Sequence, residues 1–581
     1  MVPDVGTKPP GAVLAAERFV PGIAAARTYQ RAWLTNDIVA GLVLTALLVP
    51  QGMAYAELAG LPAITGLYTS IMCLLAYAVF GPSRILVLGP DSSLGPMIAA
   101  TILPLVGANG DPAKAIALAS TLALLVGAFM IVAGIGRLGF VADLFSKPTQ
   151  IGYMNGLALT IMVGQLPKLF GFSIDADSFL EELSGFVRGV ADGETVPEAL
   201  AIGVAGLAII LGLGRIAPKV PGVLVAVVAA ISAVVVFDLG NQGVALVGEL
   251  PQGFPPLTLP SVGFSDLALL VAGALGITLV SLTDTISTSS AFAERTGQEV
   301  DANQEMIGIG TANLAAGLFQ GFPVSTSGSR TAVAERAGAK SQLTGVTGAL
   351  LIAAMLLIAP GLFRNLPQPV LASVVISASL SLADIPGTVR LWKQRRMEFV
   401  VSMVAFAGVA ILGVLPGIAV AVLISILNVF RKMWMPYRVE LGRVDGLPGY
   451  HDRRVHPEGE TVDGLVLFRF DAPLLFANAR TFRDEIRRIA GSDPRPTWIV
   501  VAAEPITDID TTAADMLEDL DVELNDRGIS LVFAEMKTPV QQKVRRYELT
   551  RTINPDHFFD TIRQAVDAFA AQQGTPPDDT S

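Results

Sequence analysis

The chain has 581 residues, of which 52% are hydrophobic and only 16% are charged, and its net charge is −11. Soluble proteins carry about 25% charged residues, so this composition excludes an ordinary globular chain and predicts a protein that crosses a membrane many times. The acidic balance argues against nucleic acid as a partner. The single cysteine, Cys73, excludes an internal disulfide, and the three histidines lack metal-ligand spacing, so no cofactor is expected.

The order of polar and apolar stretches separates a lead-in from a long membrane region. Residues 1–36 form a polar cytosolic segment without a cleavable signal, and residues 37–434 form a nearly continuous succession of apolar segments. Because a span needs roughly 17–25 residues and interrupted half-helices can be shorter, we expect about fourteen crossings in this transmembrane transport domain. The clearest spans are expected at 40–58, 67–80, 115–133, 199–213, 220–237, 267–282, 343–359 and 399–412.

The rest of the chain is soluble in character. Residues 435–462 are predicted to be a polar linker, residues 463–573 a compact α/β domain on the cytosolic side, and residues 574–581 a disordered tail. Apolar runs in the α/β domain predict buried strands, and the stretches between them predict helices. Strands are expected at 465–470, 498–502 and 529–534, and helices at 479–490, 511–526, 539–548 and 558–573.

Basic residues fall in every second loop of the membrane region, with Arg188 and Arg364 as exceptions. The intervening loops are acidic or nearly free of basic residues, as in the stretch 175–198. Cytoplasmic loops carry an excess of Lys and Arg, so this alternation predicts an even number of spans with both termini in the cytoplasm. We therefore expect a multi-pass protein of the cell inner membrane.

Four polar interruptions suggest an internal repeat. They stand at Val49–Gly52 and Gly89–Ser93 in the first half, and at Leu282–Ser290 and Pro323–Arg330 in the second. Gln51 and Asp91 lie 40 positions apart, and Asp284 and Ser327 lie 43 apart. Two halves of seven spans each must face opposite ways, and inverted repeats with half-helices at the midplane are a known transporter plan. The N-termini near Asp91 and Ser327 would then point at each other.

The stretch from Gly321 to Glu335 predicts an anion site. Its Pro-Val-Ser-Thr-Ser-Gly-Ser run breaks a helix and then offers cap residues for a new one. In lipid, broken backbone is tolerated only where it faces protein or a water-filled cavity. The N-terminus of the restarted helix carries free N–H groups and partial positive charge, and Arg330 adds a full charge.

These residues resemble the sulfate permease (SulP) family, whose animal members are the solute-carrier-26 anion exchangers, with a C-terminal STAS domain. The matching segments are Val49–Ala56, Gly60–Pro62, Gly66–Tyr68, Phe80–Arg84, Gly89–Pro90, Gly321–Pro323 and Ser329–Thr331, and, for the STAS domain, Phe470–Asn478. The resemblance implies two inverted seven-span repeats, core and gate bundles, and half-helices in spans 3 and 10. It also implies a homodimer.

The resemblance further implies a set of site residues. For the substrate it implies Gln51, Tyr55, Asp91, Ser92, Ser327, Gly328 and Ser329, and Arg330 joins this predicted substrate-binding set because of its positive charge. Asp284 and Thr288 match positions at which sodium-coupled bicarbonate carriers of the family bind their cation, and they share a helix face. Asp91 departs from the family pattern, because an acid stands at the mouth of an anion site.

The charged site residues each admit more than one role. Asp91 is either a cap of span 3 or a carboxylate that repels the anion until it is protonated. Asp284 is a proton carrier, a Na⁺ ligand or an ion-pair partner of Arg330. Arg330 either attracts the anion or binds the carbonyl groups of the broken helix.

The pattern favours a transporter over an enzyme. No nucleophile–base pair or phosphate-binding glycine loop occurs, and the Asp508–Thr512 turn, which resembles a phosphorylation site of related domains, is interpreted as a helix cap. We predict a secondary active transporter of a small anion, sulfate first and then bicarbonate or a dicarboxylate. Symport with H⁺ is favoured over Na⁺. The alternatives are a passive anion channel and a membrane sensor that signals to a protein partner through its STAS domain.

Overall fold

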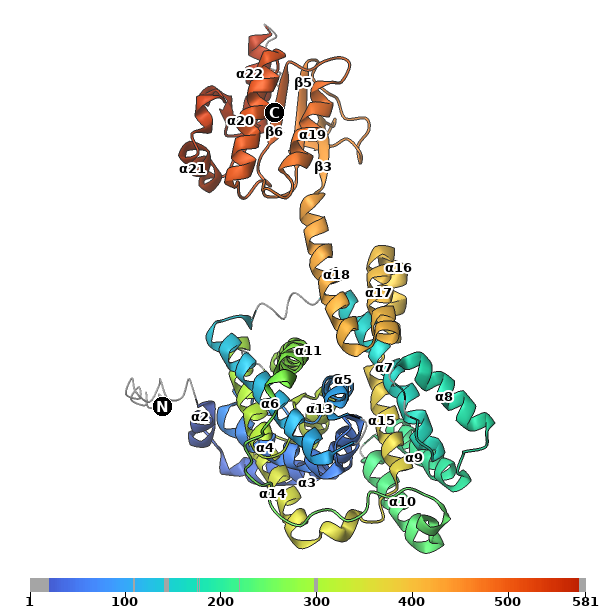
Figure 1. Ribbon diagram of the computed structural model, residues 1–581. Coiled ribbons are helices and arrows are strands. Elements are labelled where there is room, and N and C mark those ends of the chain that lie inside the picture. The colour runs from blue at the N-terminus through green and yellow to red at the C-terminus, as the bar shows by residue number, and fades with distance from the viewer. Residues whose placement is uncertain are drawn as a thin grey trace. The chain divides into compact units, whose positions relative to one another are not determined.

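The computed structural model describes residues 20–573 apart from 108–109, 140–145, 175, 177, 219 and 297–300. Most of the predicted N-terminal segment and all of the predicted tail lie outside the described residues. The chain divides into two compact units, one that ends at Ser425 and one that begins at Ile426 (Figure 1). The division falls within helix α18 (Val414–Trp434).

The first unit is helical. Seven helices are long and apolar enough to cross a membrane, and three shorter apolar helices accompany them in the described part of the chain. The helices are α2 (Pro21–Arg27), α3 (Leu34–Leu58), α4 (Ala63–Phe80), α5 (Gly95–Val106), α6 (Pro112–Ile135), α7 (Lys147–Phe170), α8 (Phe179–Ala191), α9 (Pro197–Ile216), α10 (Gly222–Phe237), α11 (Phe264–Thr296), α12 (Ala302–Leu318), α13 (Gly328–Arg336), α14 (Leu343–Ile358), α15 (Gln368–Leu382), α16 (Ile385–Gln394) and α17 (Arg396–Leu412).

These helices form two bundles. We call α3–α6 with α11–α14 the core bundle, and α7–α10 with α15–α17 the gate bundle (Figure 1). In the core bundle α12 packs against α6 and α4, and α14 packs against α3. In the gate bundle α7 packs against α17 and α15. Helix α3 also contacts α15 and α10, so it lies where the two bundles meet.

Two of the four predicted polar interruptions are breaks and two are not. The segments before α5 and α13 leave the helix and form two-residue strands, β1 (Leu88–Gly89) and β2 (Ser325–Thr326), which pair antiparallel. Helix α3 continues through Pro50, and Leu282–Ser290 lies inside the continuous helix α11. The prediction of breaks at Val49–Gly52 and Leu282–Ser290 is therefore wrong, because polar residues within a span can face protein without freeing the backbone.

The Pro50-Gln51-Gly52 motif serves close helix packing. Helices α3 and α4 approach so closely that a Cβ on Gly66 would lie 1.9 Å from the carbonyl oxygen of Gly52. Only glycine at position 66 permits this approach. It fixes the height and rotation of α3, and with them the positions of Gln51 and Tyr55.

The second unit is an α/β domain with a six-stranded sheet of order β4-β3-β5-β6-β7-β8. Strands β5 to β8 are parallel, and β3 is antiparallel to β5 and β4. Helices α19 to α21 belong to the core on one face, and α22 packs on the other. The elements are β3 (Arg438–Arg443), β4 (Tyr450–Asp452), β5 (Leu465–Phe470), α19 (Ala479–Ala490), β6 (Trp498–Ala502), α20 (Thr511–Asp526), β7 (Ser530–Ala534), α21 (Thr538–Arg546), β8 (Phe558–Phe559) and α22 (Ile562–Gln572).

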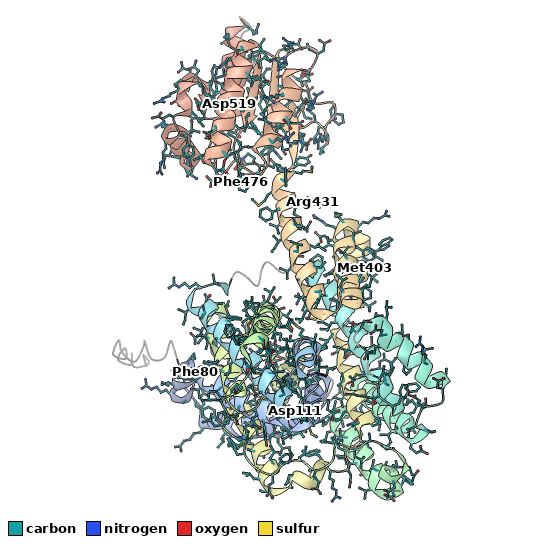
Figure 2. All side chains as sticks on the ribbon, viewed as in Figure 1. Phe80, Asp111, Met403, Arg431, Phe476 and Asp519 are labelled. Carbon is teal, nitrogen blue, oxygen red and sulfur yellow. The ribbon has the colours of Figure 1, made fainter. Side chains whose placement is uncertain are left out.

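Strands β3 and β4 come from the stretch 435–462, in which the sequence predicted only a polar linker. In β3, Val439 and Leu441 are buried and alternate with polar residues. Polar residues dominate this stretch, and its short strands lie at the edge of the sheet, so only every second side chain enters the core. Phe476, labelled in Figure 2, lies in the loop before α19 and is 68% exposed.

Candidate anion site

The broken segment before α13 is held by side chains of neighbouring helices. Ser120 donates a hydrogen bond to the carbonyl of Gly321, and the amide of Phe322 donates to Thr69 Oγ1. Asn313 accepts a hydrogen bond from the amide of Val324 at 2.9 Å and donates to its carbonyl at 3.2 Å. Buried backbone without a partner costs free energy, and these side chains remove that cost in place of the missing helix.

The two broken segments support each other. The amide of Ser327 donates to the carbonyl of Val87, and the amide of Val87 donates to Thr331 Oγ1, both at 3.0 Å. Both bonds extend the pairing of β1 with β2 at the end marked by Val87 and Ser327. The beginnings of α5 and α13 are therefore fixed relative to each other.

Helix α13 begins at the centre of this arrangement. Ser327 is its N-cap, and its hydroxyl accepts from the amide of Arg330 and contacts Ser329 Oγ at 3.1 Å. Gly328 and Ser329 occupy the first turn, where an amide has no acceptor within the helix. These amides and the helix dipole favour an anion at this end.

Arg330 lies in the first turn and is 1% exposed. Its Nη2 is 3.6 Å from Asp91 Oδ1. Among the described residues, none accepts a hydrogen bond from Nε, Nη1 or Nη2 of this guanidinium. A Cβ on Gly89 would lie 2.9 Å from Nη1, so the glycine leaves the room that the guanidinium occupies. A buried guanidinium with unsatisfied donors is suited to a planar or tetrahedral oxyanion.

One carboxylate, Asp91, pairs with Arg330, and a second, Asp284, lies near Asp91. Asp91 Oδ2 accepts from the amide of Ser93 at 3.0 Å and from its hydroxyl at 2.7 Å, so Asp91 closes a turn before α5, whose N-cap residue is Leu94. The same hydroxyl lies 3.4 Å from Asp284 Oδ2 on α11. Ser93 thereby links the acid at the start of α5 with the acid on α11. Its single hydroxyl proton is donated to one carboxylate at a time.

The other predicted site residues surround this group. Tyr55 is buried, and it lies near Ser92, Asp91 and Arg330. Thr288 stands one turn after Asp284, and its Oγ1 is 3.9 Å from the position of a Cβ on Gly328. Gln51 is partly buried on the same helix as Tyr55, one turn earlier. The structure thus brings α3, α11 and the starts of α5 and α13 together.

Three features of the site were not predicted from the sequence. Ser93 connects the two acids, although the Asp-Ser-Ser run gave a signal for a cap. Asn313 on α12 holds the broken segment before α13, and no local sequence pattern predicts this role. From the gate bundle, Gln150 lies near Asp284, and the Tyr153 hydroxyl is 3.6 Å from Met97 Sδ on α5. The site therefore borders the gate bundle.

A further buried acid, Glu305 on α12, stands apart from the site. It accepts hydrogen bonds from the hydroxyls of Tyr77, at 2.6 Å, and of Ser83. Gln342 donates to the carbonyls of Ser83 and Leu86 at 2.8 and 2.9 Å. Glu305 and Gln342 together position the segment that leads into β1. In the described residues no group of three His, Cys, Asp or Glu side chains could hold a metal ion.

Two family models match this chain. The model of the sulfate permease family matches residues 34–405, and the model of the STAS domain matches residues 456–565. The chain belongs to the sulfate permease family. It is a multi-pass membrane protein of a transporter family and not an enzyme, and the resemblance inferred from the sequence is confirmed.

Relatives extend over nearly the whole chain. It is 41% identical to a probable sulfate transporter of Mycobacterium tuberculosis over 552 residues, which covers 95% of this chain and 98% of that protein. It is 30% identical to the probable sulfate transporter 3.3 of Arabidopsis thaliana, with 95% and 91% covered.

Solved structures show the same fold. The murine solute carrier 26 member A9 anion transporter, in its inward-facing state, matches with a TM-score of 0.88 and 22% identity over 98% of this chain and 96% of that one. The transmembrane domain of the cyanobacterial bicarbonate transporter BicA matches with a TM-score of 0.59 and 22% identity over 69% of this chain and 98% of that domain.

Proposed function

We propose that the protein is a secondary active transporter that carries sulfate across the cell inner membrane together with protons. The observation that carries the proposal is Arg330, a buried guanidinium whose three nitrogens have no hydrogen-bond acceptor among the described residues. It stands at the first turn of α13, beside the start of α5. Two helix N-termini and one full positive charge lie close together, and such an arrangement favours a small anion.

Sulfate is the favoured substrate, and bicarbonate or a dicarboxylate comes second. A tetrahedral dianion can accept hydrogen bonds from the guanidinium on one side and from the first-turn amides of α13 on the other. Tyr55 and Ser92 would complete the pocket, with Gln51 one turn away on α3. The names of the relatives from Mycobacterium and Arabidopsis support sulfate, and the likeness to a bicarbonate transporter keeps that anion in view.

The charge balance supports proton coupling. Arg330 is one positive charge, whereas Asp91 and Asp284 are two potential negative charges joined through Ser93. If both acids are ionised, the site repels an anion before it arrives. A proton on either acid removes this repulsion, and ionisable groups within spans serve such roles. Na⁺ at Asp284 and Thr288 is the second option, because it would neutralise the same charge.

We further infer fourteen spans in two inverted halves, with both termini in the cytoplasm. In this scheme α3, α4, α5, α6, α7, α9 and α10 correspond in order to α11, α12, α13, α14, α15, α17 and α18. Contacts of one half recur in the other under this correspondence: α3 with α14 matches α11 with α6, and α3 with α13 matches α11 with α5. The pair α7 and α17 likewise matches α15 and α9. Movement of the core bundle against the gate bundle would then expose the site alternately.

The domain assignment follows from this scheme. We propose a transport domain over 37–434 and a STAS domain over 463–573, with the segments 1–36, 435–462 and 574–581 around them. A homodimer remains our expectation.

Uptake into proteoliposomes tests the proposal. Labelled sulfate, bicarbonate and fumarate are offered with an inward proton gradient, with an inward sodium gradient and with neither. Accumulation of sulfate only with the proton gradient is expected. Accumulation driven by sodium alone would replace the proton by Na⁺. Flux that never exceeds the equilibrium set by the membrane potential would favour the channel, and anion binding without flux would favour the sensor.

A further inference from the structure

Helix α16 carries an apolar stripe that is largely exposed. Ile385, Val389 and Trp392 are 60%, 46% and 54% exposed. They stand at positions i, i+4 and i+7, which is one face of a helix. Figure 2 shows the side chains of α16, next to α17 with its labelled Met403, projecting from the outside of the bundle.

The opposite face of α16 is firmly attached to the gate bundle. Asp384 caps the helix by accepting from the amide of Gly387 at 2.8 Å. Asn155 on α7 accepts from the amide of Asp384 at 2.7 Å and donates to Thr388 Oγ1 at 2.8 Å. Leu391 is buried between these helices. The stripe is therefore held in one orientation.

A dense group of basic residues adjoins the stripe. Four of them fall within seven positions at the end of α16 and the beginning of α17: Arg390, Lys393, Arg395 and Arg396. Arg395 pairs with Glu398 at 3.5 Å, and Arg396 lies over the ring of Trp392 at 5.6 Å. Among the residues that the structure describes, Arg390 and Lys393 form no ion pair.

Basic and apolar residues line the same hollow. A surface depression of about 540 Å³ runs along α16, and both apolar and basic residues line it. Its lining residues are Ile385, Pro386, Val389, Arg390, Lys393 and Gln394. A ligand that fits it combines a hydrocarbon part with a negative group.

We propose that α16 binds an anionic phospholipid of the cytoplasmic leaflet, with the phosphate at Arg390 and Lys393 and an acyl chain along the stripe. Helix α16 stands between the apolar helices α15 and α17 in the chain, and it packs against α17 and α7 of the gate bundle. Exposed Trp beside Lys and Arg is typical of the headgroup level, and basic clusters there attract anionic lipids. The proposal rests on the predicted cytoplasmic side of this loop but on neither the substrate nor the coupling ion.

Native mass spectrometry of the full chain, released from nanodiscs with equal amounts of phosphatidylglycerol and phosphatidylcholine, tests the site. The wild-type protein is expected to retain phosphatidylglycerol. The variant R390Q/K393Q should retain it about 25-fold less strongly, since each basic residue near an anionic surface contributes roughly fivefold. The charge-conserving variant R390K/K393R should retain the lipid.

The variant R215Q serves as the control, because it removes one exposed positive charge from another predicted cytoplasmic loop. It should behave as wild type, while R390Q alone should lose about fivefold. The proposal is overturned if R390Q/K393Q keeps the lipid, or if R215Q loses as much as R390Q. It is also overturned if R390Q/K393Q separates protomers in phosphatidylcholine alone, because the stripe would then bind a second copy of the chain.

Discussion

The segments that lead into α5 and α13 share a geometry but carry opposite charges. Each leaves the membrane helix, forms a two-residue strand and restarts as a helix at the same place. The first brings Asp91 to the start of its helix and the second brings Arg330, and the two side chains are 3.6 Å apart. The two segments thus share a backbone geometry, and they differ in the charge that each brings to the site.

Removal of the positive partner should have the largest effect. In R330Q the anion loses its only nearby buried cation among the described residues, and Asp91 loses its partner. Truncating one member of a buried charge pair costs about 2–5 kcal/mol, so sulfate binding to the purified protein should weaken at least about 30-fold. R336Q, an exposed change in the last turn of the same helix, is the control. Unchanged sulfate binding in R330Q would remove Arg330 from the site.

Removal of the second acid should separate transport from coupling. In D284N the site still holds Arg330 and the α13 amides, so exchange of sulfate for sulfate should continue. Accumulation driven by the proton gradient should fall to the equilibrium level, because the proton carrier is missing. Both fluxes are measured in proteoliposomes, with D266N on the same helix as the control. Wild-type accumulation in D284N would eliminate this role.

The two segments can also be compared by removing the amide side chain that holds each of them in place. Asn313 satisfies both backbone groups of Val324, whereas Gln342 satisfies two carbonyls in the segment before β1. N313A leaves a buried amide and carbonyl unpaired and should destabilise the protein by about 2–3 kcal/mol, against about 1–2 kcal/mol for Q342A. Thermal unfolding in detergent gives both values. Equal losses of stability would show that the segment before α13 does not depend on Asn313 more than the segment before β1 depends on Gln342.

The last prediction concerns a buried acid of the STAS domain. Burial raises the pKa of Asp521 to about 6, while its hydrogen bond from Asn525 opposes the rise. The folded state therefore binds this proton more tightly than the unfolded state, and stability is lost as the pH rises from about 4 to about 6. D521N should stabilise residues 435–573 by about 1–3 kcal/mol at pH 7.5 and have no effect below pH 4.

Urea unfolding of that segment at both pH values checks this expectation. K543Q, which breaks the exposed pair with Asp508, is a suitable reference because such pairs contribute about 1 kcal/mol or less. A D521N gain that is equal at pH 4 and pH 7.5 would show that the carboxylate charge is not the cause.

Much of the site could be predicted because helix-breaking and charged residues are conspicuous within apolar spans. Pro323 with its Ser and Gly neighbours indicated a broken segment, and Asp91, Asp284 and Arg330 indicated charges that need partners. The roles of Ser93 and Asn313 could not be read, since each depends on residues far away in sequence. Leu282–Ser290 was misjudged because a polar face on a continuous helix has the same composition as a break. Strands β3 and β4 were missed because both are short and polar residues dominate the stretch that contains them.

The hydrogen-bonded pairing of β1 with β2 has a consequence for the direction of transport. Because it ties the two half-helices together, a movement of the core bundle carries both anion-binding ends at once, and the same guanidinium and amides would surround the anion whichever side is open. The intrinsic affinity would then be equal on the two faces of the membrane. Such a protein would run forward or backward with equal ease, and the gradients of anion and coupling ion, together with the membrane potential, would decide the direction.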